Sequence, residues 1–195
     1  MSSLHKKKPK DDTQQIQNIA PKTWDYLRSH ICEFKKRKSL IYKNAPDFAM
    51  FGIGEYSFKK YKVAISGFYK KPLFSLITAD KAVMLDDTCY FLSFDSFDEA
   101  YMMTLLLNTK PVQNLLISIA FLNSKRPYTK KILQRIDIKK AFSCVTFDEF
   151  KKIETTIKNL PYLTKEMYLN FKNLIFDFDK RNIDIESQYY NIKGA

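Results

Sequence analysis

The sequence predicts an α+β protein with a small mixed or antiparallel sheet flanked by helices and a helical C-terminal extension. β-prone runs separated by turn signals fill residues 48–94, whereas apolar residues at three- and four-residue spacing dominate the last third. Of the side chains, 45% are hydrophobic and 28% charged, which is too apolar for a disordered chain and too charged for a membrane protein.

The N-terminal residues 1–20 are polar and contain a lysine cluster, so we expect a flexible basic tail. A helical pattern then opens at Pro21. Its apolar face consists of residues at helical spacing, namely Trp24, Leu27, Ile31 and Phe34. The basic run 35–38 lies near the end of this pattern, where it fits a solvated helix end and a phosphate contact equally well.

The middle of the chain is predicted to form the sheet. Its β-prone runs are 48–54, 61–67, 74–78, 82–85 and 88–92. Turns are expected at 54–57 and at Asp86–Asp87, since aspartate side chains accept hydrogen bonds from nearby backbone amides. Three of the four glycines fall between residues 52 and 67, where we expect a positive φ or a close approach of the backbone.

The last third is predicted to be helical. The expected helices are 98–107, 112–121, a short helix after Thr129, 147–160 and 164–179. Ser96 or Asp95 is expected to cap the first of them. The predicted organisation is therefore a tail (1–20), a domain (21–140) and a helical extension (141–195).

Metal and disulfide chemistry are not predicted. The three cysteines, Cys32, Cys89 and Cys144, are far apart, and the two histidines do not complete a zinc-binding spacing with them. Gly52 and Gly54 form only a fragment of a dinucleotide-binding motif. We therefore expect no catalytic, cofactor-binding or metal-binding residue in this chain.

No stretch approaches the ~18 apolar residues that a membrane span needs, and no apolar segment follows the N-terminal lysines. We expect a soluble, cytoplasmic protein without a membrane partner.

The positive charge is concentrated in the first part of the chain. The formal net charge is +12, and residues 1–75 hold 16 Lys and Arg against 6 Asp and Glu, whereas the remainder holds 17 against 15. A regional positive field attracts polyanions, most often nucleic acid and next anionic lipid. A coding bias toward lysine would not by itself leave the rest of the chain nearly balanced.

Basic and aromatic residues interleave between residues 56 and 71, a composition that suits contact with phosphates and bases. In an alternating strand, Tyr61 and Val63 would face the core while Lys60 and Lys62 face solvent. The candidate DNA-contacting residues are Lys59, Lys60, Lys62, Lys70, Lys71, Lys125 and Arg126, with Tyr56 and Tyr69 as possible neighbours of a base or sugar.

Several motifs, taken in order, resemble the C-terminal target-recognition region of adenine-specific DNA methyltransferases of bacterial restriction-modification systems. They include Trp24-Asp25-Tyr26-Leu27, Phe51-Gly52-Ile53-Gly54-Glu55-Tyr56-Ser57-Phe58, Tyr61-Lys62-Val63-Ala64-Ile65-Ser66-Gly67-Phe68-Tyr69-Lys70, Val83-Met84-Leu85-Asp86-Asp87-Thr88 and Lys125-Arg126-Pro127-Tyr128-Thr129. The resemblance spans roughly residues 21–140. The chain departs from the family where Lys59-Lys60 replaces Ala-Pro and Asp80-Lys81-Ala82 replaces Gly-Lys-Pro.

The resemblance implies a module that reads a short duplex DNA sequence for an enzyme that methylates adenine N6 with S-adenosylmethionine. The family's Asn/Asp-Pro-Pro-Tyr/Phe catalytic motif is only partly matched by Asn44-Ala45-Pro46-Asp47-Phe48. The cofactor is therefore expected on a catalytic domain or a separate catalytic chain, and this chain is not expected to be catalytic alone.

Two alternatives stay open from the residues. A restriction endonuclease could bind Mg²⁺ through carboxylates around Asp47, Asp86 and Asp87. A protein-interaction subunit could instead dock helices 147–160 and 164–179 on a methyltransferase, with their apolar faces exposed in the isolated chain.

Overall fold

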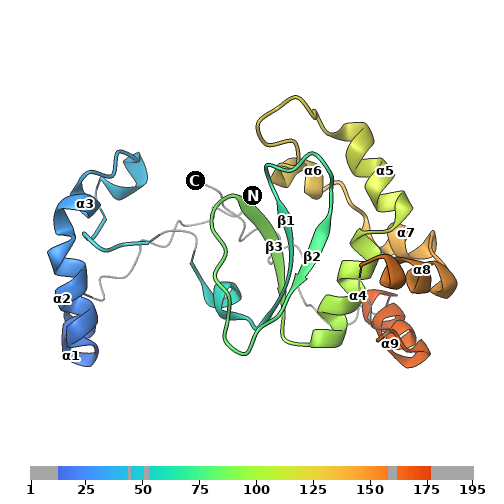
Figure 1. Cartoon of the computed structure of the whole chain (residues 1–195), viewed down its shortest axis with the longest axis horizontal. Coiled ribbons are helices and arrows are strands. Elements are labelled where there is room, and N and C mark those ends of the chain that lie inside the picture. Colours follow the sequence, from blue (N-terminus) through green and yellow to red (C-terminus); the bar gives the residue numbers. More distant parts are fainter. Residues whose placement is uncertain (1–12, 44, 51–52, 158–161, 177–195) are drawn as a thin grey trace, which may run out of the picture. The chain divides into compact units, whose positions relative to one another are not determined.

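The chain forms two compact units, which span residues 1–53 and 54–195. The structure is a computed structural model that describes residues 13–43, 45–50, 53–157 and 162–176 (Figure 1). Within these ranges the fold class is the expected one, a mixed α+β fold with helices after the sheet.

The described residues of the N-terminal unit form three short helices and a 3-10 turn. They are α1 (Thr13–Ile19), α2 (Pro21–Ser29), α3 (Ile31–Lys35) and η1 (Leu40–Tyr42). The helix expected from Pro21 is confirmed, but it is interrupted at His30, whose φ of −105° and ψ of 12° are not helical. Within the expected tail 1–20, residues 13–19 form helix α1, and residues 1–12 lie outside the described residues.

Three aromatic rings form the centre of the N-terminal unit. The Phe48 ring meets Trp24 edge-on at 5.6 Å and Phe34 edge-on at 5.2 Å between ring centroids. The expected strand 48–54 is wrong in its described residues, which are irregular. The Arg37 guanidinium donates instead to the backbone oxygen of Ala49 in this segment and to that of Asp47 just before it.

The second unit is built on a three-stranded antiparallel sheet. Its strands are β1 (Tyr61–Ser66), β2 (Phe74–Ile77) and β3 (Cys89–Phe94), in the spatial order β2-β1-β3. The register places Val63 opposite Leu76 on one side and opposite Leu92 on the other. Three of the predicted strands are thereby confirmed.

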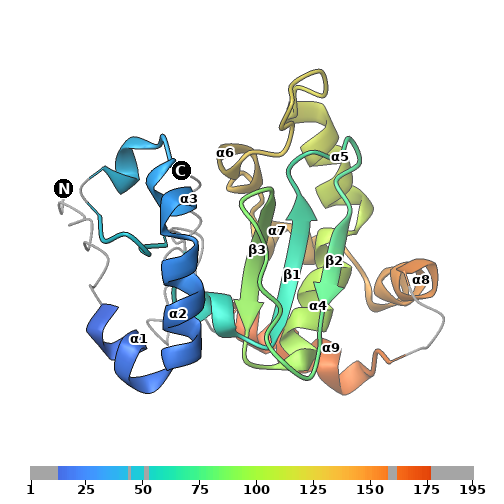
Figure 2. The same ribbon diagram turned by 60° about the vertical axis from the view of Figure 1, so that its left-hand side comes forward.

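The strand predicted at residues 82–85 is wrong, because this segment has no strand structure. Both β2 and β3 are antiparallel to β1, so they run in the same direction. The chain between them must therefore return along the whole sheet, and residues 78–88 make that connection (Figure 2). The apolar residues at 82–85 occur in this return segment.

Helix α4 (Phe97–Leu107) packs on one face of the sheet, and every residue from Ala100 to Leu107 is buried. The Ser96 hydroxyl oxygen accepts a hydrogen bond from the Glu99 amide at 3.4 Å, which confirms Ser96 as the cap. At the other end, Asn108 accepts from the Phe74 amide and donates to the Phe74 carbonyl. These bonds fix the end of α4 to the start of β2.

Five further helices lie in the described part of this unit. They are α5 (Lys110–Ile119), α6 (Lys130–Leu133), α7 (Ile138–Ser143), α8 (Phe147–Ile157) and α9 (Lys165–Phe176). All but α7 are predicted from the sequence, within a few residues at their described ends; residues 158–160 and 177–179 of the predicted helices lie outside the described residues. None of the described helices has the length and apolar character needed to cross a membrane.

Helices α8 and α9 pack against α4, so they share the core of the sheet (Figure 1). Phe150 of α8 is fully buried, and Phe171 and Ile175 of α9 are buried beside it. Most of the apolar surface of these helices is thus covered within this chain, but Leu169 and Phe176 of α9 stay 46% and 41% exposed. Among the described residues, the interaction-subunit alternative is left with this smaller apolar surface on α9.

A buried carboxylate joins α4 to α8 and to the start of α9. Glu154 is 1% exposed, and its Oε1 atom accepts hydrogen bonds from the Tyr101 hydroxyl and from the Tyr162 and Leu163 amides. The Lys151 ammonium lies 3.5 Å from Oε2. Burial acts to raise the pKa of Glu154, but these hydrogen bonds and Lys151 outweigh it, so the pKa is lowered.

Candidate nucleic-acid interface

Three loops meet at the end of the sheet where β1 ends and β3 begins (Figure 2). They are the β1–β2 loop, the turn before β3 and the loop between α5 and α6. Four of the predicted DNA-contacting cations belong to these loops, namely Lys70, Lys71, Lys125 and Arg126. We call these four residues, with Phe68 and Tyr69, the loop cluster.

Gly67 allows two of these loops to approach each other. Its amide donates to the Thr88 carbonyl at 2.7 Å. A Cβ atom at this position would lie 2.9 Å from the Thr88 oxygen and 3.3 Å from the Tyr90 ring. The close approach expected for a glycine in this region is thus confirmed at Gly67, because any larger residue would push the turn away.

The Asp86–Asp87 turn is also confirmed, and it anchors the third loop. The Thr88 amide donates to Asp86 Oδ1 at 3.0 Å, as in an Asx turn. The Arg126 guanidinium pairs with the Asp87 carboxylate at 3.1 Å and donates to the Asp87 carbonyl at 3.2 Å. The same guanidinium lies over the Phe68 ring, 5.0 Å from its centroid. Arg126 therefore holds all three loops together.

Lys70 adds a second connection between the loops. Its ammonium donates to the Ser124 carbonyl at 2.8 Å, and its own carbonyl accepts from the buried Tyr128 hydroxyl at 2.6 Å. Lys125 lies 5.7 Å from the centroid of the Phe68 ring. The partner of Lys70 is thus a carbonyl and that of Lys125 a ring, so neither contact pairs the lysine with a carboxylate.

Exposed aromatic rings accompany these cations. Tyr69 is 67% exposed, and Phe121, in the same loop as Lys125, is 71% exposed. The sequence prediction includes Tyr69 but misses Phe121 and Phe68. A signal for Phe121 exists, since Phe121-Leu122 ends the α5 pattern and directly precedes the basic loop 124–127.

Lys59 and Lys60 lie at the opposite end of β1. Since β1 has six residues, the two ends are separated by roughly 17 Å. Lys59 is paired with Asp95, and Lys60 lies 5.5 Å from the centroid of the Tyr61 ring.

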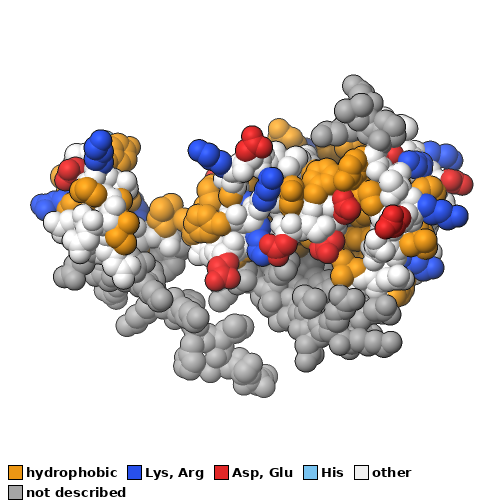
Figure 3. Space-filling model, turned by 90° about the horizontal axis from the view of Figure 1, so that it is seen from below, with side chains coloured by type: hydrophobic (Ala, Val, Ile, Leu, Met, Phe, Trp, Pro, Cys, Tyr) orange, Lys and Arg blue, Asp and Glu red, His pale blue; other side chains and the backbone are white. Residues whose placement is uncertain are grey.

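Figure 3, seen from below Figure 1, shows Lys and Arg side chains interspersed with Asp and Glu, so the coloured part of this face carries no continuous cationic surface.

Lys62 is not on an exposed face, which corrects the expected alternation along β1. Its side chain is 1% exposed, its ammonium donates to the Lys59 carbonyl, and it lies 5.9 Å from the centroid of the Phe91 ring. The 3-10 turn η2 (Glu55–Phe58) contacts β3 and brings the half-buried Tyr56 within 5.8 Å of Phe91. Both faces of β1 are therefore covered, and burial lowers the pKa of the Lys62 ammonium.

Replacing Lys62 with methionine is expected to leave the unfolding free energy within about 1 kcal/mol of the original chain. The variant loses a hydrogen bond to a carbonyl but no longer buries a charge. Duplex affinity is expected to change less than twofold. A salt-dependent loss of affinity in Lys62→Met, with an unchanged denaturation midpoint, would instead place Lys62 at the DNA.

The carboxylates considered for Mg²⁺ do not form a site in the described part of the chain. Asp86 holds the Thr88 turn and Asp87 is paired with Arg126. Asp47 belongs to the N-terminal unit, where its carbonyl accepts from Arg37. Within these ranges, no group of three or more His, Cys, Asp or Glu side chains could hold a metal ion.

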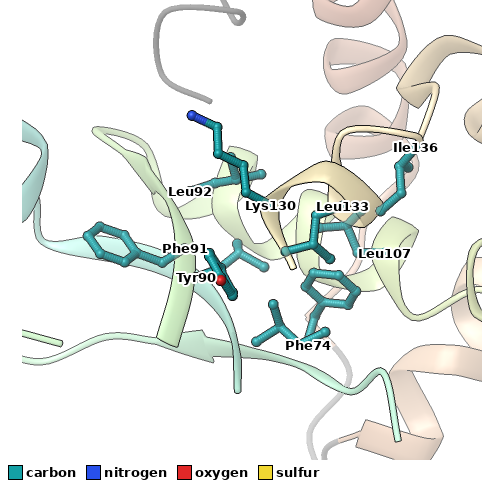
Figure 4. Close-up of a pocket in the computed structure, with 10 residues that line it drawn as sticks. Phe74, Tyr90, Phe91, Leu92, Leu107, Lys130, Leu133 and Ile136 are labelled. Atoms are coloured by element: carbon teal, nitrogen blue, oxygen red, sulfur yellow. The ribbon is translucent and has the colours of Figure 1, made fainter. Parts of the chain in front are cut away.

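A small cavity lies between the sheet and α6 (Figure 4). Its volume is about 20 Å³, and it is lined by apolar side chains such as Phe74, Leu107 and Leu133. This is room for about one water molecule. This cavity is therefore too small for S-adenosylmethionine, the cofactor implied by the resemblance.

The comparisons with known proteins relate the chain to part of a type II DNA methyltransferase. It is 42% identical over 130 residues to the type II methyltransferase M.NspV of Nostoc sp.. The matched region covers 66% of this chain but only 27% of that enzyme. No protein-family model and no solved structure matches the chain.

Proposed function

We propose that the chain is a sequence-specific DNA-binding module, the target-recognition part of a restriction-modification DNA methyltransferase. The observation that carries the proposal is the 42% identity to M.NspV over 130 residues. The proposed DNA is double-stranded, and the associated reaction is methylation of adenine N6. S-adenosylmethionine is assigned to a catalytic domain or a separate catalytic chain.

The loop cluster supports this proposal physically. Lys70, Lys71 and Lys125 can neutralise phosphates, while the exposed rings of Tyr69 and Phe121 can contact bases or sugars. Arg126 uses two of its five N–H donors on Asp87, so others stay available for an acceptor on DNA. The connections through Gly67 and Arg126 pre-organise the surface, which lowers the entropy cost of binding.

Selection of bound duplexes from a randomised pool, at a stated salt concentration, tests the proposal. We expect one enriched motif of a few base pairs. A matched control is the Gly67→Val chain, in which the side chain would collide with Thr88 and separate the loops. Equal recovery of all sequences by the original chain would contradict sequence-specific recognition.

A further inference from the structure

The N-terminal unit contains a hollow that the function proposed above does not use. It has a volume of about 350 Å³ and lies between the end of α3 and the loop that follows it. Since about 10–15 Å³ of such space holds one water molecule, the hollow has room for a phosphate group and its immediate surroundings. Its charged lining consists of Lys35, Arg37, Lys38, Lys43 and Asp47.

Arg37 builds this hollow. Its guanidinium donates to the carbonyls of Phe34 at 3.0 Å, Asp47 at 2.5 Å and Ala49 at 2.7 Å, and thereby draws the loop back onto α3. The guanidinium also lies 3.9 Å from the centroid of the Tyr42 ring. Because these partners are carbonyl oxygens and a ring, the charge of Arg37 is oriented but not neutralised.

The charges around the hollow are unbalanced. Four cations and one carboxylate give a formal net charge of +3. Within the described residues, no ion pair is found for Lys35, Lys38 or Lys43, all of which are exposed. Lys36 differs, since it does not line the hollow and is paired with Glu33 at 2.9 Å. In the basic run 35–38, Lys36 therefore belongs to a solvated helix end, whereas the other three residues line the hollow.

We propose that this hollow binds a phosphate of a nucleic-acid backbone. Lysine ammonium groups from both sides of the loop suit a compact anion, and the walls formed by Phe34, Leu40 and Tyr42 suit the attached sugar or base. The same charge disfavours a cationic ligand such as S-adenosylmethionine. The inference deepens the proposed function, on which it rests for the identity of the nucleic acid.

The test compares two variants of the full chain that each lose two lysines. Lys38 and Lys43 line the hollow, whereas Lys22 and Lys36 are exposed in the same unit but do not. We expect K38Q/K43Q to bind duplex DNA about fivefold more weakly at ~0.15 M salt and to reduce the slope of log K against log salt by about 0.9, the value for one phosphate contact. K22Q/K36Q should stay within twofold.

Trp24, the chain's one tryptophan, gives a second readout. Phe48 contacts both Trp24 and Phe34, and Phe34 lines the hollow. When inorganic phosphate is added to the original chain, the fluorescence of Trp24 should therefore change and then reach a plateau. The same titration of K38Q/K43Q should give no such change. An equal change with chloride at matched ionic strength would overturn the inference.

The two proposals fail in different ways. If selection yields a motif while K38Q/K43Q binds DNA like K22Q/K36Q, the hollow is not a phosphate site and the proposed function stands. If K38Q/K43Q loses affinity and no motif is ever enriched, the hollow binds phosphate but the recognition function is wrong.

Discussion

Replacing Lys71 and Lys125 with glutamine is expected to weaken binding to every duplex on the order of 30-fold at ~0.15 M salt. Both side chains are exposed in the loop cluster, and neither ammonium is paired with a carboxylate among the described residues. Glutamine removes the charge with little change in size. The slope of log K against log salt should become less steep by about 1.8, which corresponds to two phosphate contacts.

The matched control for this double variant is K152Q/K172Q. These two lysines are exposed on α8 and α9, so their replacement removes the same charge from elsewhere on the same unit. We expect this control to bind within about threefold of the original chain. Lysines that do not touch the DNA attract it only over a distance, and salt screens that attraction. Equal losses in both variants would show that net charge, rather than the loop cluster, attracts DNA. Fluorescence anisotropy with a labelled duplex measures both.

Glu154→Gln is expected to lower the unfolding free energy by about 3 kcal/mol near pH 7. The carboxylate accepts three hydrogen bonds on Oε1. An amide that directs its oxygen at these donors makes weaker bonds because it is neutral, and an amide that directs its NH₂ group at them loses the bonds. Tyr101→Phe removes one of these bonds and should cost about 1–2 kcal/mol. Urea denaturation followed by circular dichroism measures both effects.

The effect of Glu154 should depend on pH. Its pKa is lowered in the folded chain, so the unfolded chain binds a proton more readily and stability falls as the solution is acidified. The contribution is complete above about pH 6 and is lost progressively below about pH 5. The difference between the original chain and Glu154→Gln should therefore shrink toward low pH. Glu166→Gln, an exposed carboxylate on α9, serves as the control. A difference that is constant with pH would contradict a charged Glu154.

The strands of the sheet could be predicted because the residues within and beside each strand are typical of strands and turns. The runs 61–67 and 74–78 combine β-branched and aromatic residues with bounding turn signals, and both become strands. The run 82–85 is equally apolar but has no aromatic residue and one β-branched residue, and it forms part of the return connection that the sheet topology requires. Helix α7 was missed, since its six residues are too few to show a clear period.

The candidate interface was only partly predictable for a related reason. The basic residues could be identified, but Lys70 meets Ser124 across 54 positions of sequence, a contact that no local pattern indicates. The error at Lys62 came from assuming one solvated face, whereas both faces of β1 are covered. Only tertiary structure separates the clustered Lys70, Lys71, Lys125 and Arg126 from the distant Lys59 and Lys60.

Photo-crosslinking of the full chain to a selected, 5-iodouracil-substituted duplex tests the central claim most directly, because the crosslinked peptides identify the surface that touches DNA. The loop cluster, with its exposed Tyr69, and the neighbouring exposed Phe121 are expected to supply the crosslinked peptides of the second unit, from residues 67–73 and 120–129. Crosslinks that fall instead on α8 and α9, with none in these two loops, would contradict the proposed recognition surface.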